Sequence, residues 1–252
     1  MKPDTIERFS NRVENYIKYR PTYPPEVLEL FRSEMGLTEE STLADIGSGP
    51  GNLARQFLEN GNTVYCVEPN EAMRKAAENL LGKYPGFRSI NGDSENTTLP
   101  DASVDFVTAA QAFHWFRPEP TKKEFRRILK PDGYAALIWN IRQLDSTPFL
   151  REYEQFILEN ANDYAAVRHE NITETEIAAF FESSYGKATF DNIQVFDFEG
   201  IRGRLFSSSY MPAEDSEKGR QIEKDLRRLF DKYAREGRIE VFYDTEIYYS
   251  KL

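Results

Sequence analysis

Three glycines at alternate positions follow a short, mostly apolar run early in this sequence. Residues 43–46 form the run, which includes Asp45, and Gly47, Gly49 and Gly51 come directly after it. An apolar run, a glycine-rich break and a resumed helical pattern predict a strand, a tight loop and a helix. Because glycine has no Cβ, a ligand can approach the backbone of such a loop closely. The pattern indicates a cradle for a nucleotide-type ligand.

The spacing of the glycines argues against two common nucleotide sites. A dinucleotide loop has the pattern G-x-G-x-x-G, but Asn52 stands where its third glycine belongs, and Pro50 removes a backbone donor. The lysine that marks a P-loop is also missing after these glycines. The cradle is therefore predicted for a ligand that needs no pyrophosphate contact.

Carboxylates stand at the ends of three predicted strands. Asp45 precedes the glycines, Glu68 follows the strand predicted at 63–67, and Asp93 follows the strand predicted at 87–90. The carboxyl ends of parallel strands meet at one edge of a sheet, where such sheets bind ligands. Asp45 can hold an ammonium group there, Glu68 can accept from both ribose hydroxyls, and Asp93 can accept from an adenine amine. The ligand implied has an amine, a ribose and an adenine.

Two polar side chains come just after the fourth predicted strand, residues 104–109. These are Gln111 and His114. A histidine is half-charged near neutral pH, so His114 is a candidate general base. Arg142 and Arg204, in later segments, are candidates for contact with a substrate, and an acid would pair naturally with an arginine fork.

The elements that must position these residues alternate between strand and helix. This alternation predicts an α/β fold, a doubly wound, mostly parallel sheet of seven strands with helical lid segments. We expect one domain, 1–252, made of an N-terminal helical lid (1–36), a ligand-binding core (37–142) and a C-terminal half with helical insertions and the last strands (143–252). The predicted strands are 42–46, 63–67, 87–90, 104–109, 134–139, 188–198 and 239–249. The predicted helices after the lid are 51–60, 70–82, 118–129, 147–162, 173–183 and 213–236, and 130–133 is predicted as a turn.

Composition narrows the classes of partner. The chain has 252 residues and a formal net charge of −10, and an acidic surface repels nucleic acid. The single cysteine, Cys66, suits a reducing compartment. The two histidines, His114 and His169, show no metal-ligand spacing, so no metal is expected. No run approaches the ~18 apolar residues of a membrane span, so a cytoplasmic protein without membrane contact is expected.

The motifs together resemble those of class I S-adenosylmethionine-dependent methyltransferases. The matching pieces are residues 43–51, 67–69, 92–95, 99–107 and 129–133, in the order and spacing of that family. The stretches 9–24 and 110–116 are similar to a small-molecule branch that includes trans-aconitate methyltransferase-like proteins. The resemblance implies a Rossmann-like methyltransferase fold with S-adenosyl-L-methionine as cofactor and S-adenosylhomocysteine as product.

The resemblance also implies where the cofactor binds. Tyr16 and Arg20 are expected to close over its methionine end, and a backbone carbonyl of this region, that of Ala109 or Ala110, is expected to lie beside its amine. The Ser94 backbone is expected beside the adenine ring. The full set of expected cofactor contacts is Tyr16, Arg20, Asp45, Gly47, Ser48, Gly49, Glu68, Pro69, Asp93, Ser94, Ala109 and Gln111.

The expected function is methyl transfer to a small-molecule acceptor at oxygen, with His114 as the candidate catalytic residue. Two alternatives stay open. One is a cofactor-binding protein without catalysis that acts as a regulatory partner. The other is a methyltransferase acting on tRNA or protein, which the acidic charge disfavours and for which no Asn-Pro-Pro-Tyr motif follows residues 104–109.

Overall fold

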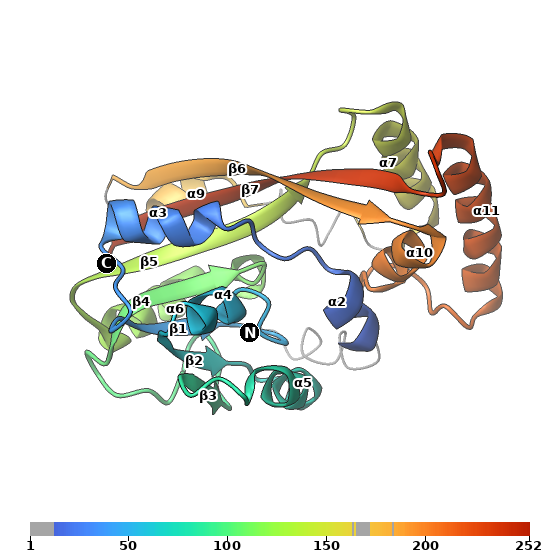
Figure 1. Cartoon of the computed structure of the whole chain (residues 1–252). Coiled ribbons are helices and arrows are strands. Elements are labelled where there is room, and N and C mark those ends of the chain that lie inside the picture. The colour runs from blue at the N-terminus through green and yellow to red at the C-terminus, as the bar shows by residue number, and fades with distance from the viewer. Residues whose placement is uncertain (1–12, 163, 165–171, 183) are drawn as a thin grey trace.

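A seven-stranded sheet forms the centre of the molecule (Figure 1). The computed structural model describes residues 13–162, 164, 172–182 and 184–252. The strand order is β3-β2-β1-β4-β5-β7-β6. The strands are β1 (Thr42–Ile46), β2 (Thr63–Val67), β3 (Phe87–Ile90), β4 (Val104–Ala110), β5 (Leu129–Arg142), β6 (Gly186–Phe196) and β7 (Ile239–Lys251).

The first five strands run parallel, and β7 pairs antiparallel with both β5 and β6. Parallel neighbours need crossover connections. Helices supply them from β1 to β2, from β2 to β3 and from β4 to β5, whereas residues 91–103 connect β3 to β4 without a helix. The predicted fold class, a doubly wound and mostly parallel seven-stranded sheet, is confirmed.

Helices cover both faces of the sheet. Alternate residues of β1 point to opposite faces, so Leu43 packs in one hydrophobic cluster while Ala44 and Ile46 pack in another. Helices α3 and α4 contribute to the first cluster, and α6 and α9 to the second. The helices of this part are α2 (Val13–Tyr19), α3 (Glu26–Met35), α4 (Ala54–Glu59), α5 (Glu71–Leu81), α6 (Pro118–Ile128) and α9 (Glu174–Phe181), with the short 3-10 helix η2 (Phe113–Trp115) after β4.

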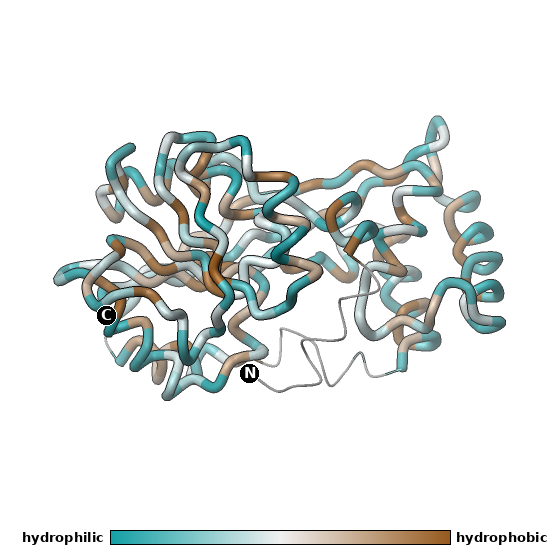
Figure 2. The backbone as a smooth tube through the Cα atoms, turned by 90° about the horizontal axis from the view of Figure 1, so that it is seen from below, coloured by the Kyte–Doolittle hydropathy of each residue, from teal (hydrophilic) through white to brown (hydrophobic). Residues whose placement is uncertain are grey.

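The three longest strands carry a second group of helices beyond the rest of the sheet (Figure 1). This group, which we call the cap, consists of α7 (Pro148–Asn160), α10 (Phe198–Phe206) and α11 (Glu217–Tyr233). The cap has a third hydrophobic cluster of its own, to which the ends of β6 and β7 add Phe196, Ile239 and Val241. Figure 2 shows the outer helix α11 as mostly hydrophilic, as expected for a helix with one buried stripe.

The structure differs from the predicted elements at several places. The predicted turn 130–133 lies inside β5, because Leu129 already pairs with Val104 and the register shifts before Tyr134 pairs with Phe106. The helix predicted at 51–60 begins only at Ala54. Helix α10 was not predicted; Asp197 follows the last residue of β6 and caps α10 by accepting from the amide of Gly200 at 2.8 Å.

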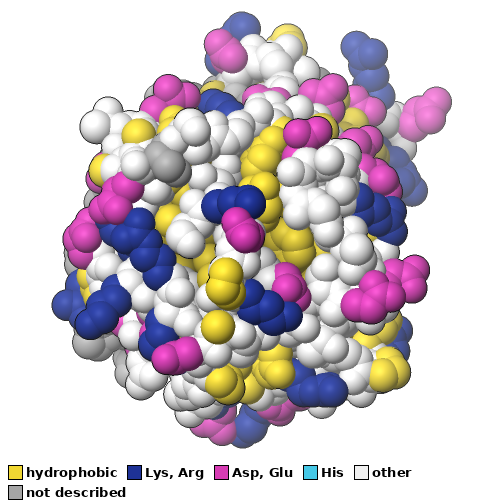
Figure 3. Space-filling view, turned by 90° about the vertical axis from the view of Figure 1, so that its left-hand side faces the viewer, with side chains coloured by type: hydrophobic (Ala, Val, Ile, Leu, Met, Phe, Trp, Pro, Cys, Tyr) yellow, Lys and Arg dark blue, Asp and Glu magenta, His cyan; other side chains and the backbone are white. Residues whose placement is uncertain are grey.

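The surface carries mixed charges. On the face at the left of Figure 1, basic and acidic side chains lie interspersed (Figure 3). Among the described residues, no helix is both long and apolar enough to cross a membrane.

Gly51 allows a stability test of the glycine loop. Its φ is +88°, and a Cβ there would lie 2.2 Å from Cδ1 of Leu81 on α5. We expect Gly51→Ala to lower the free energy of unfolding by about 3 kcal/mol, because the φ strain adds to a clash in the core. Chemical denaturation of the variant and the wild type measures this difference.

Gly61→Ala is the matched control. Gly61 has a φ of +99°, but no atom lies within 4 Å of a Cβ built there. This variant should lose only about 1 kcal/mol, from the φ strain alone. Equal losses in the two variants would contradict the packing of Gly51 against α5.

Candidate functional site

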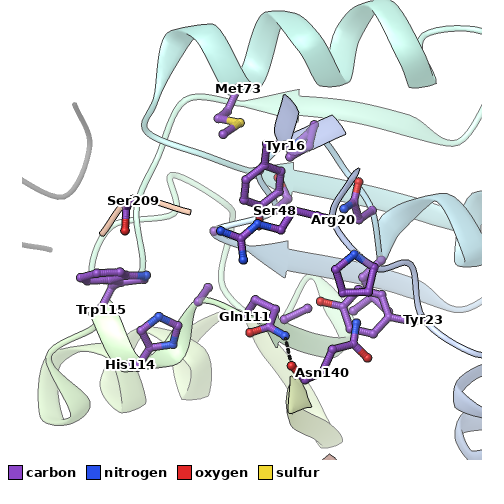
Figure 4. Close-up of a pocket in the computed structure, with 18 of the residues that line it drawn as sticks. Tyr16, Arg20, Tyr23, Ser48, Met73, Gln111, His114, Trp115, Asn140 and Ser209 are labelled. Carbon is purple, nitrogen blue, oxygen red and sulfur yellow. Dashed lines mark hydrogen bonds between the residues drawn. The ribbon is translucent and has the colours of Figure 1, made fainter. Parts of the chain in front are cut away.

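A cavity lies at the carboxyl edge of the parallel strands (Figure 4). It lies where the glycine loop after β1 meets the cap and the α2 segment, by which we mean α2 and the residues after it up to Tyr23. Its lining comes from the glycine loop after β1, from the ends of β2, β4 and β5, and from helices on both sides. The lining residues are Tyr16, Arg20, Pro21, Tyr23, Asp45, Gly47, Ser48, Gly49, Pro50, Asn52, Leu53, Glu68, Asn70, Met73, Ala110, Gln111, Ala112, His114, Trp115, Asn140, Arg142, Leu144, Tyr164, Arg204, Ser209 and Tyr210.

The Glu68 carboxylate binds the glycine loop to the end of β2. Its Oε2 accepts from the amide of Gly49 at 2.9 Å, and its Oε1 accepts from the amide of Asn70 at 2.8 Å. Burial raises the pKa of Glu68, while the two amide bonds oppose that rise. Gly49 has a φ of +55° and open space where a Cβ would stand, so a ligand can reach the loop backbone.

Asp45 lines the cavity, and one of its two carboxylate oxygens accepts no hydrogen bond from the described residues. Its Oδ1 accepts from the Thr108 hydroxyl at 2.8 Å, while its buried Oδ2 has no hydrogen-bond partner among the described residues. Burial raises the pKa of Asp45 to about 7, and the nearby Glu68 carboxylate adds to the rise. A buried acceptor left unpaired is costly, so this oxygen is suited to a ligand that donates.

The α2 segment lies over the cavity and is held to the cap. The Arg20 Nη2 donates to the carbonyl of Ser207 at 3.1 Å and to the Ser208 hydroxyl at 3.4 Å. The Tyr19 ring fits against Gly203 of α10, where a Cβ would lie 1.9 Å from the ring. The Arg20 Nε is buried and has no partner among the described residues, so it is available to an acceptor atom of a ligand.

Gln111 and His114 lie together at the end of β4 (Figure 4). Gln111 donates from Nε2 to the carbonyl of Asn140 at 3.0 Å. The Trp139 indole donates to Nδ1 of His114 at 3.5 Å. A neutral imidazole that accepts at Nδ1 carries its proton on Nε2, so this bond favours His114 as a donor at Nε2. The role of general base stays a prediction.

The cap side of the cavity contains guanidinium groups. Arg142 pairs with Glu154 on α7 and donates to the Tyr164 hydroxyl at 3.4 Å. Arg204 donates from Nε to the Tyr243 hydroxyl and from Nη1 to the Ser208 hydroxyl, each at 3.2 Å. The cavity therefore has carboxylates on the strand side and guanidinium groups on the cap side.

Most of the predicted site residues meet in this cavity. Those that line it are Tyr16, Arg20, Asp45, Gly47, Ser48, Gly49, Glu68, Gln111 and His114. The candidates Arg142 and Arg204 line it as well, although they come from β5 and from a helix of the cap.

Four predicted residues are not among the lining: Pro69, Asp93, Ser94 and Ala109. The Asp93 Oδ1 accepts from the amides of Glu95 and Asn96 at 2.8 and 3.0 Å, which makes it a turn residue. Ser94 is buried and bonds the Thr121 hydroxyl, and Ala109 is buried in β4, where its neighbour Ala110 faces the cavity. The adenine contacts of Asp93 and Ser94 stay predictions.

Asn140, Tyr164 and Leu144 line the cavity without having been predicted. Asn140 had a usable signal, because it is polar and ends the strand predicted at 134–139. Tyr164 and Leu144 had none, because they lie outside regular predicted elements and reach the cavity only through the folding of the cap. Among the described residues, no group of three or more metal-ligating side chains is present.

Comparison with known proteins gives a consistent assignment. Residues 44–137 match the family model described as a methyltransferase domain. An uncharacterised methyltransferase of Schizosaccharomyces pombe is 34% identical over 150 residues, which is 59% of this chain and 58% of that protein. An uncharacterised methyltransferase of Mycobacterium bovis is 32% identical over 149 residues, again 59% and 58% of the two lengths. The matched part thus spans less than two thirds of these relatives.

Solved structures share the fold. A structure from Anaeromyxobacter dehalogenans that bears the name type II methyltransferase has a TM-score of 0.67 at 20% identity. The match covers 92% of this chain and 98% of that one. A methyltransferase of Geobacter sulfurreducens, solved in complex with S-adenosyl-L-homocysteine, has a TM-score of 0.54 at 16% identity, covering 97% and 98%. Residues 44–137 are therefore similar to a methyltransferase domain, and the chain has the Rossmann-like fold of these methyltransferase structures.

Proposed function

We propose that this protein is an S-adenosylmethionine-dependent methyltransferase that methylates an oxygen of a small-molecule acceptor. The observation that carries the proposal is the unpartnered Oδ2 of Asp45, buried beside the glycine loop in a chain with a methyltransferase domain. That oxygen fits the ammonium group of the cofactor, which is the donor it lacks.

Other residues of the cavity fit the remaining parts of the cofactor. The unpartnered Nε of Arg20 fits the carboxylate of the methionine part, since guanidinium groups bind carboxylates in a fork. Glu68 would accept from the ribose hydroxyls, since each carboxylate oxygen accepts more than one hydrogen bond. The open space at Gly49 admits the ligand against the loop.

Methyl transfer requires mainly that the methyl group and the acceptor atom are aligned. When bound, the cofactor supplies a methyl group already activated by a sulfonium. Asp45 and Arg20 would hold the methionine part of the cofactor and Glu68 its ribose, and this restraint would provide the gain of a fixed reacting geometry. The α2 segment and the cap exclude water from the reacting groups.

The acceptor half of the cavity favours a small molecule that reacts at oxygen. Its walls are side chains of this same chain, including Trp115, Tyr164 and Tyr210, so the acceptor must fit between them. The guanidinium groups on the cap side attract an anionic oxygen and repel a protonated amine. An oxygen acceptor that arrives ionised needs no base, which agrees with the donor tautomer favoured for His114.

The ionisation of Asp45 should make cofactor binding depend on pH. The carboxyl group titrates near pH 7 in the free protein and must be ionised to pair with an ammonium group. We expect the affinity for S-adenosylhomocysteine to rise about tenfold between pH 5.5 and 7, because the protonated fraction of Asp45 falls over this range. Isothermal titration calorimetry across this range measures the slope.

Asp45→Asn is the matched control for this pH dependence. It removes the titrating group at nearly constant volume, so binding should weaken and the slope with pH should flatten. A slope as steep in the variant as in the wild type would assign the titration to another group.

Substitution of Glu68 should weaken the cofactor complex. We expect Glu68→Gln to lower the affinity for S-adenosylhomocysteine by roughly 10- to 100-fold, because an amide loses one of the two charged acceptors. Calorimetry gives the affinity, and thermal unfolding without ligand shows how far the loop itself is destabilised. The same calorimetry on Asp93→Asn tests the predicted adenine contact, and unchanged affinity in both variants would refute the proposed placement of the ribose and adenine.

A further inference from the structure

The guanidinium groups of three arginines line the cavity, and they differ in whether a carboxylate pairs with them. Arg142 forms an ion pair with Glu154. Arg20 and Arg204 line the same cavity, but among the described residues neither has a carboxylate within ion-pair distance. Their guanidinium groups donate to uncharged hydroxyl groups and to a backbone carbonyl. Arginine stays protonated in proteins, so two positive charges lie in the cavity without an ion-paired carboxylate in the described part of the chain.

These two uncompensated groups lie next to each other. The hydroxyl of Ser208 accepts from Nη2 of Arg20 at 3.4 Å and from Nη1 of Arg204 at 3.2 Å. Burial lowers the pKa of Arg20, and the charge of Arg204 lowers it further. Two like charges held this close in a buried site favour the binding of anions.

The proposed cofactor has one carboxylate, so it can pair with only one of the two guanidinium groups. The Arg20 guanidinium lies over the ring of Tyr16, 5.1 Å from its centre, and Tyr16 is one of the residues expected to contact the cofactor. The Arg20 Nε, which has no partner among the described residues, fits the single cofactor carboxylate. Arg204 lies among the cap tyrosines and is bonded to Tyr243. The charge of Arg204 is left for the other ligand of the cavity.

We infer that Arg204 determines acceptor specificity by binding a carboxylate of the acceptor. This inference rests on the proposed function and names the class of its substrate, a small carboxylic acid. One guanidinium charge is left uncompensated, which matches the single charge of a carboxylate better than the two charges of a phosphate. Tyr243 and Ser208 fix two nitrogens of the guanidinium, so the fork is oriented before the acceptor binds.

Binding measurements on the protein saturated with S-adenosylhomocysteine test the role of Arg204. The probes are a panel of small aliphatic and aromatic carboxylates, each paired with its uncharged primary amide, together with inorganic phosphate. The wild type should bind at least one carboxylate, and its paired amide at least tenfold more weakly. Arg204→Met should weaken carboxylate binding by about 30- to 100-fold while the affinity for S-adenosylhomocysteine stays within about threefold.

Two further variants make the test specific. Arg202→Met removes a guanidinium from the same helix, but one that pairs with Glu214 and Glu223 and does not line the cavity, so carboxylate binding should match the wild type. Arg204→Lys keeps the charge without the fork and should restore part of the affinity that Arg204→Met loses. It also provides a readout where the Met variant folds poorly.

Three results would overturn the inference: carboxylate binding by Arg204→Met equal to that of the wild type, no preference of the wild type for carboxylates over amides, or binding of phosphate but of no carboxylate. Failure of the wild type to bind S-adenosylhomocysteine would refute the cofactor assignment instead. The carboxylate panel applied to the protein without added cofactor then still decides the role of Arg204.

Discussion

The two hydrogen bonds of the Glu68 carboxylate fix the floor of the cavity. One joins the glycine loop after β1 to the end of β2, and the other joins that same strand end to the start of α5. Because Glu68 is buried, these bonds form in a low dielectric, where a carboxylate without donors would be costly. The loop is thereby held open toward the cavity before any ligand binds.

The parallel sheet determines which side chains meet at that floor. Strand β1 lies between β2 and β4, so the residues that end these three strands are neighbours in space. Asp45 and Thr108 are paired in register across β1 and β4, and the hydroxyl therefore reaches one oxygen of the carboxylate and leaves the other unpartnered. The register of two strands thus produces the acceptor that the proposed cofactor needs.

The walls of the cavity depend on the long strands that carry the cap. Strands β5 and β7 pair from Tyr134 with Lys251 to Arg142 with Tyr243, so they run well past the short strands of the parallel part. Arg204 and Tyr210 of the cap region line the same cavity as the glycine loop. Arg20, which follows α2, is held to this cap region by its hydrogen bonds to Ser207 and Ser208. The result is a cavity with acidic groups on one side and basic groups on the other, which suits a zwitterionic ligand beside an anionic one.

The sequence by itself determined the sheet, the glycine loop and the carboxylates at the strand ends. These features are local, because an apolar run, a break at glycine and an acidic residue at the end of a strand occupy a few neighbouring positions. Parallel strands then bring the carboxyl ends of the strands together at one edge of the sheet. For this reason the sequence predicts Asp45, Gly49 and Glu68 at one edge of the sheet, and all three line the same cavity.

Only the tertiary structure decided how each charge is compensated. Arg20, Arg142 and Arg204 look alike in the sequence, but long-range folding places Glu154 against Arg142 and leaves the other two beside uncharged partners. Asp93 resembles Glu68 as an acidic residue at a strand end, but its own loop supplies two amide donors and it does not line the cavity. Burial and the partners of a side chain depend on residues far apart in the chain, so spacing along the sequence does not contain them.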